Sequence, residues 1–246
     1  MPTRILGVIP ARFASSRFPG KPLAVIAGKT MLQHVYERAL QARYLSRTII
    51  ATDDDRIYDE ACRFGAPVRR TRADHPSGTD RVAEVASAEN CELVVNIQGD
   101  EPLIDPGAVD AAVLSMLDAP EIPMGTLKKR IEHDQEHSNP NVVKVVTDRK
   151  GNAVYFSRSP IPYTRDENEL RSTPRYKHIG LYVYQKDFLL NYSSLPVGPL
   201  ETAERLEQLR AIENGYAIRV VETEYESLGV DTPEDLERVA TLFAAY

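Results

Sequence analysis

The first half of the chain alternates short apolar runs with longer stretches of helical periodicity, and this alternation constrains the fold more than any other feature. The runs ILGVI at 5–9 and TIIAT at 48–52 have the length and composition of buried strands. Between them, MLQHVYERALQA at 31–42 repeats apolar residues on one helical face. Strands that alternate with helices at this spacing form parallel βαβ units. We therefore expect an α/β protein with a mostly parallel sheet flanked by helices.

The same patterns predict further elements and a change of organisation in the second half. Helices are expected at 54–65, 79–90, 105–117, 200–215 and 232–245, the last beginning with a TPED capping box. Strands are expected at 67–71, 92–98, 124–131, 141–148, 152–159, 177–185 and 216–223, with a DRKGN turn at 148–152. The consecutive strands predict a mixed-sheet extension, and the polar, proline-containing stretch 160–177 predicts a long mobile loop. Because no linker interrupts the chain, we expect a single domain over 1–246.

Charge and composition exclude several classes of protein. The formal net charge of −6 over 246 residues is unfavourable for a general nucleic-acid or membrane-surface binder. No apolar run approaches the roughly 20 residues of a membrane span, and the apolar run near the N-terminus is too short for a signal peptide. Cys62 and Cys91 have no metal-like spacing and fit two free thiols. These features favour a cytoplasmic protein.

The loop after the first expected strand carries an unusual group of side chains. Arg12, Arg17 and Lys21 are joined there by the hydroxyls of Ser15 and Ser16. Open α/β sheets bind ligands at such loops, and these side chains can neutralise and bind phosphate oxygens. A solvated basic surface loop is the alternative interpretation.

Three familiar motifs do not explain the chain. The dinucleotide motif GxGxxG is absent, and the GKT at 28–30 lacks the first glycine of a P-loop because Leu23 occupies that position. The GKT is therefore expected to form a turn before a helix, with Thr30 near its cap. HDQEH at 133–137 fits the pattern HxxEH, but it lacks a helical apolar face and Asn139–Pro140 ends it, so we reject a zinc site.

The stretch PARFASSRFPGKPL at 10–23 resembles the signature of the sugar-acid cytidylyltransferases. The resemblance runs nearly end to end and includes VVNIQGDEP at 94–102, YFSRSPIP at 155–162, HIGLYVY at 178–184 and PLETAERLEQLR at 199–210. Members that act on sialate tend to have a more glycine-rich first loop than the Phe13–Ala14 found here, which favours the branch for 3-deoxy-D-manno-octulosonate (KDO). The resemblance implies a Rossmann-like nucleotidyltransferase sheet. It also implies Mg²⁺-dependent transfer of CMP from CTP to the anomeric hydroxyl of KDO, for lipopolysaccharide biosynthesis.

The resemblance further implies which residues act on the nucleotide. Arg12, Lys21 and Asp100 are the expected catalytic residues. Contacts to CTP are expected from Ala11, Arg12, Ser15, Lys21, Arg72, Ser77, Gly78, Thr79 and Gln98. The residues themselves support base recognition, because Gly78 permits close approach of backbone to a flat base and Gln98 offers both a donor and an acceptor. A helix start capped by Ser77 or Thr79 is compatible with the same segment.

Two aspartates are the expected ligands of Mg²⁺. Asp100 follows the strand expected at 92–98, and Asp231 follows an apolar stretch and precedes a helix. Taken alone, each also fits an ordinary acidic turn or helix start. The resemblance implies that both reach metal at the triphosphate. The triplet at 53–55 is a rival, but it directly precedes a helix and is assigned mostly a structural role.

The sugar acid is expected to contact one face of the strand at 177–185 and two further segments. His178 and Tyr182 alternate with apolar residues, so they share a face that is either ligand-binding or simply half-exposed. Arg158 could pair with a carboxylate, and Glu207 and Gln208 could accept from sugar hydroxyls. The resemblance implies KDO contacts at all five positions.

Alternatives remain open at this point. The substrate could be another acid sugar, such as sialate or 8-amino-KDO, or the chain could be a non-catalytic nucleotide sensor. The resemblance also suggests a homodimer, for which 120–160 has enough apolar strand character to form the interface.

Overall fold

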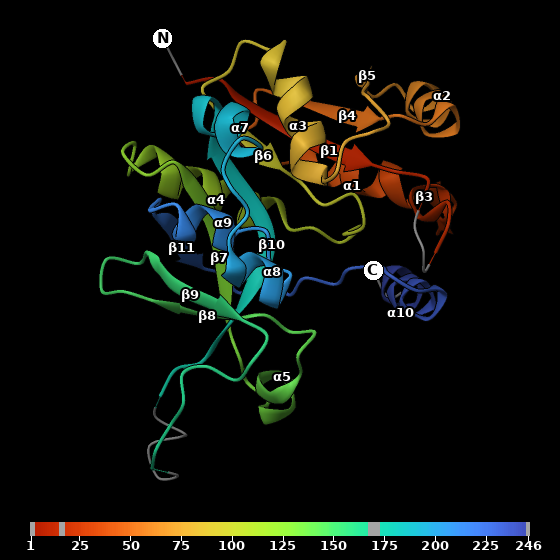
Figure 1. The fold of residues 1–246 in the computed structure, drawn as a ribbon. Coiled ribbons are helices and arrows are strands. Elements are labelled where there is room, and N and C mark those ends of the chain that lie inside the picture. The colour runs from red at the N-terminus through yellow and green to blue at the C-terminus, as the bar shows by residue number, and fades with distance from the viewer. Residues whose placement is uncertain (1–2, 15–17, 167–172, 245–246) are drawn as a thin grey trace. The chain divides into compact units, whose positions relative to one another are not determined.

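The computed structural model describes residues 3–14, 18–166 and 173–244, and the chain forms two compact units (Figure 1). The first unit contains residues 1–110, 184–190 and 227–246, and the second contains 111–183 and 191–226. The expectation of a single domain stays a prediction. Within the described residues, no helix is both long and apolar enough to cross a membrane.

The first unit is built on four parallel strands. Their order is β6 (Leu93–Asn96), β1 (Ile5–Ala11), β4 (Arg47–Thr52) and β5 (Val68–Arg70). Val8 and Ile9 on β1 are fully buried, as are Ile49 and Ile50 on β4. Strands covered on both faces need apolar residues at successive positions, which explains why their sequences read as continuous apolar runs. The expected α/β class, with a mostly parallel sheet and flanking helices, is confirmed.

The helices of the first unit each begin within one residue of the expected start. They are α1 (Met31–Ala39), α2 (Asp55–Arg63), α3 (Gly78–Ser87) and α10 (Pro233–Ala244). Helix α4 (Pro106–Leu117) runs on into the second unit, as does α7 (Lys186–Tyr192), which the sequence analysis did not anticipate. Ser77, and not Thr79, caps α3, in a reciprocal capping box with Asp80. Helix α3 packs against β1, β4 and β6 (Figure 1).

The GKT at 28–30 lies in a small hairpin that sequence reasoning did not predict. Strands β2 (Val25–Ile26) and β3 (Lys29–Thr30) pair across a turn in which Ala27 and Gly28 have φ of 47° and 83°. Thr30 then caps α1 by accepting from Gln33 N. The expectation of a turn before a helix is confirmed. The short helix η1 (Lys21–Leu23) precedes the hairpin.

The C-terminal segment packs onto this hairpin. Ile26, Met31, Val230 and Val239 form one buried cluster, which joins α10 to β2. The backbone N–H of Val230 donates to Asp100 O at 2.9 Å. The chain before α10 is therefore held beside the turn that follows β6.

The second unit holds the mixed-sheet extension. Its strands are β7 (Met124–Arg130), β8 (Lys144–Thr147), β9 (Ala153–Ser157), β10 (Tyr176–Gln185) and β11 (Ile218–Glu222). Strand β11 is parallel to β7, whereas β8 is antiparallel to both β9 and β10. The turn at 148–152 is confirmed, with Gly151 at φ 81°. The HDQEH stretch forms the five-residue helix α5 (Asp134–Ser138), whose side chains are exposed or half-buried.

The prediction of a single helix at 200–215 is wrong. The structure has two short helices, α8 (Pro199–Glu204) and α9 (Leu209–Glu213), separated by Arg205 at φ 53°. Side chains from elsewhere satisfy carbonyls at the break, because Arg158 Nε donates to Glu204 O and the Tyr192 hydroxyl donates to Glu207 O. Local periodicity could not reveal these partners, which replace the hydrogen bonds of a continuous helix.

Candidate active site

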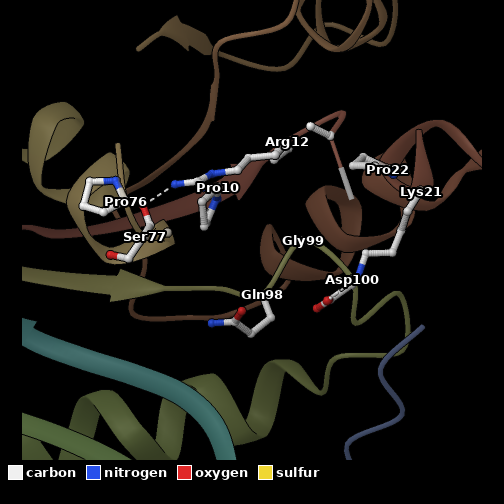
Figure 2. Close-up of a pocket in the computed structure, with 12 residues that line it drawn as sticks. Pro10, Arg12, Lys21, Pro22, Pro76, Ser77, Gln98, Gly99 and Asp100 are labelled. Atoms are coloured by element: carbon white, nitrogen blue, oxygen red, sulfur yellow. Dashed lines mark hydrogen bonds and ion pairs between the residues drawn. The ribbon is translucent and has the colours of Figure 1, made fainter. Parts of the chain in front are cut away.

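A cavity of about 410 Å³ opens in the first unit at the carboxyl ends of β1 and β6 (Figure 2). Parallel sheets bind ligands at this end of their strands. The walls come from the loop after β1, the start of α3 and the turn after β6. The lining residues are Pro10, Ala11, Arg12, Ala14, Lys21, Pro22, Pro76, Ser77, Gly78, Gln98, Gly99 and Asp100.

Arg12 joins two walls of this cavity. Its Nη2 donates to the carbonyl oxygens of His75 at 2.8 Å and Ser77 at 2.6 Å. The guanidinium is half-buried, so it lies along the cavity wall with part of its surface accessible (Figure 2). This places a permanent positive charge beside the start of α3, whose N-terminus also favours anions.

Lys21 brings the two expected metal ligands together. Its Nζ lies 2.7 Å from Asp100 Oδ2 and 3.0 Å from Asp231 Oδ1, and its side chain is 14% exposed. Burial disfavours the charged ammonium, but the two carboxylates outweigh burial and raise the pKa of Lys21. The lysine is therefore a cation at any physiological pH.

The carboxylates around Lys21 form a donor set suited to Mg²⁺. Mg²⁺ takes one or two carboxylates and completes its shell with water and phosphate oxygens. Asp100 and Asp231 converge on a single ammonium, so both can reach one cation at this position. Among the described residues, no group of three or more His, Cys, Asp or Glu side chains is placed to hold a metal ion.

The rival triplet at 53–55 is occupied by structural contacts. Asp54 caps α2 and pairs with Arg56, Asp55 pairs with Arg70, and Asp53 lies 3.0 Å from Arg81. These contacts support the structural role expected for the triplet.

Gly99 is a lining residue that sequence reasoning missed. A Cβ atom at this position would lie 2.8 Å from the carbonyl oxygen of Pro10, closer than real Cβ atoms approach. The backbones of the β1 and β6 loops therefore meet where only glycine fits. The glycine directly after an apolar strand in the QGDEP sequence was the available sign of such an approach.

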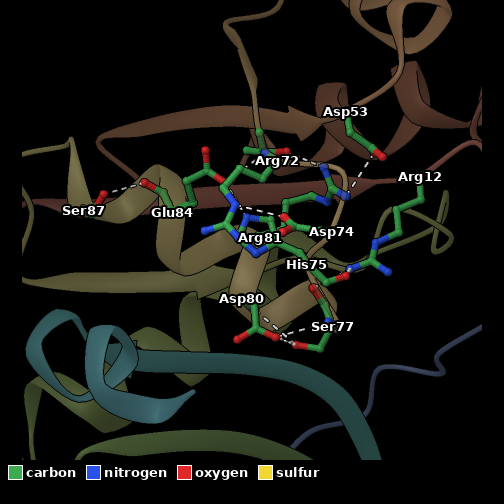
Figure 3. Close-up of polar contacts among 11 residues, drawn as sticks. Arg12, Asp53, Arg72, Asp74, His75, Ser77, Asp80, Arg81, Glu84 and Ser87 are labelled. Carbon is green, nitrogen blue, oxygen red and sulfur yellow. Dashed lines mark hydrogen bonds and ion pairs between the residues drawn. The ribbon is translucent and has the colours of Figure 1, made fainter. Parts of the chain in front are cut away.

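A polar network around the buried Arg81 supports the loop at 71–77 (Figure 3). The side chain of Arg81 is fully buried on α3, where it pairs with Asp53 and donates to the hydroxyl of Thr71. Glu84 accepts from the backbone N–H of Arg72 at 3.0 Å and pairs with the ring of His75. The network connects α3 to the loop, so it fixes the carbonyl groups that bind Arg12.

Most of the residues expected to bind nucleotide line the cavity. These are Ala11, Arg12, Lys21, Ser77, Gly78 and Gln98, and the expected metal ligand Asp100 lines the cavity as well. Arg72 instead forms a bidentate pair with Asp74, and Thr79 is buried in α3, so neither lines it. Ser15, like Ser16 and Arg17, lies outside the described residues. The binding roles of all these residues stay predictions.

His178 and Tyr182 lie together on β10 in the second unit. Their rings are 5.4 Å apart, and Phe156 meets the His178 ring edge-on at 5.0 Å. A hydrogen bond of 2.9 Å joins His178 Nε2 to Thr126 Oγ1. Burial lowers the pKa of His178 to about 3 and raises that of Tyr182, so both side chains are neutral at physiological pH.

The other expected sugar contacts lie at the end of β9 and at the α8–α9 break. Arg158 is half-buried, and its Nη1 donates to Pro140 O at 3.0 Å. Gln208 is buried, and the charge of Glu207 contributes to the raised pKa of Tyr182. Their contacts with a sugar acid stay predictions.

Comparisons with known proteins agree with this geometry. Residues 6–223 match the family described as Cytidylyltransferase. The chain is 73% identical over 245 residues to the 3-deoxy-manno-octulosonate cytidylyltransferase of Solibacter usitatus, covering 100% of this chain and 96% of the relative. A relative of the same name from Syntrophotalea carbinolica is 61% identical, with 96% of each chain covered.

Solved structures extend the comparison to the fold. A CMP:2-keto-3-deoxy-manno-octonic acid synthetase complexed with CTP superposes with a TM-score of 0.94 at 45% identity, covering 99% of both chains. A 4-diphosphocytidyl-2C-methyl-D-erythritol synthase from Anaerococcus prevotii gives a TM-score of 0.65 at 14% identity, covering 99% of this chain and 100% of the other. The second similarity concerns the fold alone.

Proposed function

Because this chain belongs to the cytidylyltransferase family, we propose that it transfers CMP from CTP to the anomeric hydroxyl of KDO, giving CMP-KDO and diphosphate for lipopolysaccharide biosynthesis. The choice of KDO is supported by full-length relatives that carry this activity in their names. The observation that carries the chemistry is the cavity at the strand ends, which Arg12, Lys21 and Asp100 all line. Cations at that point suit a triphosphate.

In the proposed reaction, the anomeric oxygen of KDO attacks the α-phosphorus of CTP. The bond from that phosphorus to the bridging oxygen breaks, diphosphate leaves, and the hydroxyl proton is lost. Negative charge grows on the phosphoryl oxygens and the leaving group, where Arg12 and Lys21 supply fixed positive charge. The raised pKa of Lys21 keeps that charge in place. Binding and orientation of the two substrates provide most of the remaining acceleration.

Mg²⁺ is the proposed cofactor, with Asp100 and Asp231 as its protein ligands. When bound, it would neutralise triphosphate charge and act as a Lewis acid. The two carboxylates would hold the ion, and Lys21, which pairs with both of them here, would supply positive charge to the bound phosphates.

The sugar acid is proposed to bind through Arg158, His178, Tyr182, Glu207 and Gln208. Arg158 supplies the cation for the sugar carboxylate. His178 and Tyr182 are neutral, so they offer hydrogen bonds to hydroxyls without the cost of burying a charge. Glu207 and Gln208 provide further oxygen acceptors.

We propose further that the protein is a cytoplasmic homodimer whose interface includes 120–160. Val154 on β9 lies in this region and is 56% exposed, so it is the position at which we test the interface. Size-exclusion chromatography with light scattering tests the dimer, and Val154→Lys should shift the protein towards a monomer.

The experiment that tests the function is pyrophosphate release with CTP, Mg²⁺ and a panel of acid sugars. The panel contains KDO, 8-amino-KDO and sialate, and a parallel reaction contains a chelator. We expect the highest kcat/KM with KDO and loss of turnover with the chelator. A preference for sialate or 8-amino-KDO would make that sugar the substrate in place of KDO. CTP binding without pyrophosphate release would support a nucleotide sensor.

A further inference from the structure

Lys144 is a fully buried lysine whose ammonium is surrounded by backbone carbonyl groups. Its Nζ donates to the carbonyl oxygens of Val142 at 2.5 Å, Arg158 at 2.6 Å and Asn139 at 2.9 Å. Three acceptors use all three ammonium protons, which compensates for burying the charge. The lysine therefore joins the loop before β8 to the residue that follows β9.

Glu204, at the C-terminal end of α8, also binds Arg158. Its carboxylate accepts from the backbone N–H of Arg158 at 2.8 Å and from the Ser157 hydroxyl at 2.6 Å. Its carbonyl oxygen accepts from Arg158 Nε at 2.7 Å. Burial lowers the pKa of Lys144, and the negative charge of Glu204 opposes that lowering.

Together these contacts restrain Arg158 at four points. Lys144 holds its carbonyl, Glu204 holds its N–H and Nε, and Pro140 accepts from its Nη1. Since an arginine side chain has substantial rotamer freedom, restraint of both its backbone and its guanidinium removes an ordering cost that a ligand would otherwise meet.

The same contacts also reach the segments that contain other residues proposed to bind the sugar. Glu204 directly precedes the α8–α9 break, which contains Glu207 and Gln208. Val143, adjacent to Lys144, accepts from the backbone N–H of His178 at 2.8 Å. Lys144 and Glu204 therefore connect three separate segments of chain.

We propose that Lys144 and Glu204 are positioning residues that preorganise Arg158 and the α8–α9 break for an acid sugar. The inference rests on the proposed function. It requires that loosening these contacts weakens the use of the sugar more than the use of CTP, because the residues that line the nucleotide cavity belong to the first unit and both side chains belong to the second.

The test is the kinetics of Glu204→Gln, a nearly isosteric change that removes the charge from the acceptor. We expect the KM for KDO to rise roughly 10- to 100-fold, as for misplacement of a substrate-orienting group, while the KM for CTP stays within about twofold. Lys144→Met is the second variant and should likewise raise the KM for KDO. Should it fail to fold, Glu204→Gln carries the test alone.

Glu201→Gln is the matched control on the same helix. Its carboxylate pairs with Arg210 at 2.6 and 2.8 Å and makes no hydrogen bond to Arg158. We expect this variant to lower the melting temperature without changing the ratio of the two KM values. Equal rises in both KM values for Glu204→Gln, the same rise in the control, or an unchanged KM for KDO in folded Glu204→Gln would each overturn the inference.

Wild-type turnover of KDO, measured first, separates the inference from the function on which it rests. If the wild type releases no pyrophosphate with KDO, the proposed function is refuted and the inference with it. If the wild type is active and Glu204→Gln has normal kinetics, only the inference is refuted.

Discussion

Replacement of Gly99 by alanine should destabilise the protein and disturb the nucleotide cavity together. The added Cβ would lie 2.8 Å from Pro10 O, and ordinary contacts of this kind begin at 3.4 Å, so about 0.6 Å must be absorbed. The opposing atom belongs to backbone at the end of β1, and Ile9 Cγ2 lies 3.5 Å away on another side. Neither neighbour can move aside as a flexible side chain would.

The expected cost follows from overpacking. Insertion of a methyl group into a tightly packed contact costs about 1–3 kcal/mol. For a chain of this size, a loss of about 2 kcal/mol lowers the melting temperature by about 4–8 °C. Because Gly99 precedes Asp100, the same displacement should weaken CTP binding.

The assay is thermal unfolding together with calorimetric titration of CTP, with Gly229→Ala as the control. A Cβ at Gly229 meets nothing within 4 Å, and this glycine lies close in sequence to Asp231. The control should change stability by no more than about 0.5 kcal/mol. If Gly99→Ala has the same melting temperature as the control and binds CTP normally, the close backbone approach does not constrain this site.

Three further changes test other parts of the structure. Asp100→Asn should abolish pyrophosphate release while the protein still folds, as circular dichroism would show, and near-normal turnover would reject its metal role. Thr232→Ala removes the hydroxyl that accepts from Asp235 N and caps α10, so urea denaturation should show a loss of about 1 kcal/mol; an unchanged midpoint would contradict the cap. Burial lowers the pKa of His178 to about 3, so between that pH and the unfolded value near 6.5 the unfolded chain binds more protons and stability falls as pH falls. His178→Gln should therefore show a shallower dependence of unfolding free energy on pH in this window, and parallel curves for the two proteins would refute the assignment.

Most elements of the fold could be predicted from the sequence because their causes are local. The parallel strands of the first unit, the turn at 148–152 and the caps Thr30 and Ser77 follow from apolar runs and turn chemistry. The prediction failed at 200–215, where Arg158 and Tyr192 satisfy carbonyls in place of helical N–H groups. The β2–β3 hairpin was missed because two-residue strands carry too little periodicity to detect.

The candidate site, like the fold, could be predicted from the sequence only in part. The chemical identity of its groups was visible in the sequence, since the loop after β1 had to place Arg12 and Lys21 at the end of a buried strand. Residues without reactive groups, such as Gly99 and Pro76, were missed because they line the cavity only through the path of the folded backbone. Arg72 was expected in the base contact, but its guanidinium pairs with Asp74 and lies off the cavity lining.

The sequence by itself determined the alternation of strands and helices and the cations placed after the first strand, because backbone periodicity and side-chain charge are properties of neighbouring residues. Only the tertiary structure decided that Lys21, Asp100 and Asp231 meet at one point, and that Lys144 and Glu204 both hold Arg158. Such meetings depend on contacts between residues distant in the chain. Their geometry is set when α10 packs on the β2–β3 hairpin and β8 pairs with β9, and no local pattern records it.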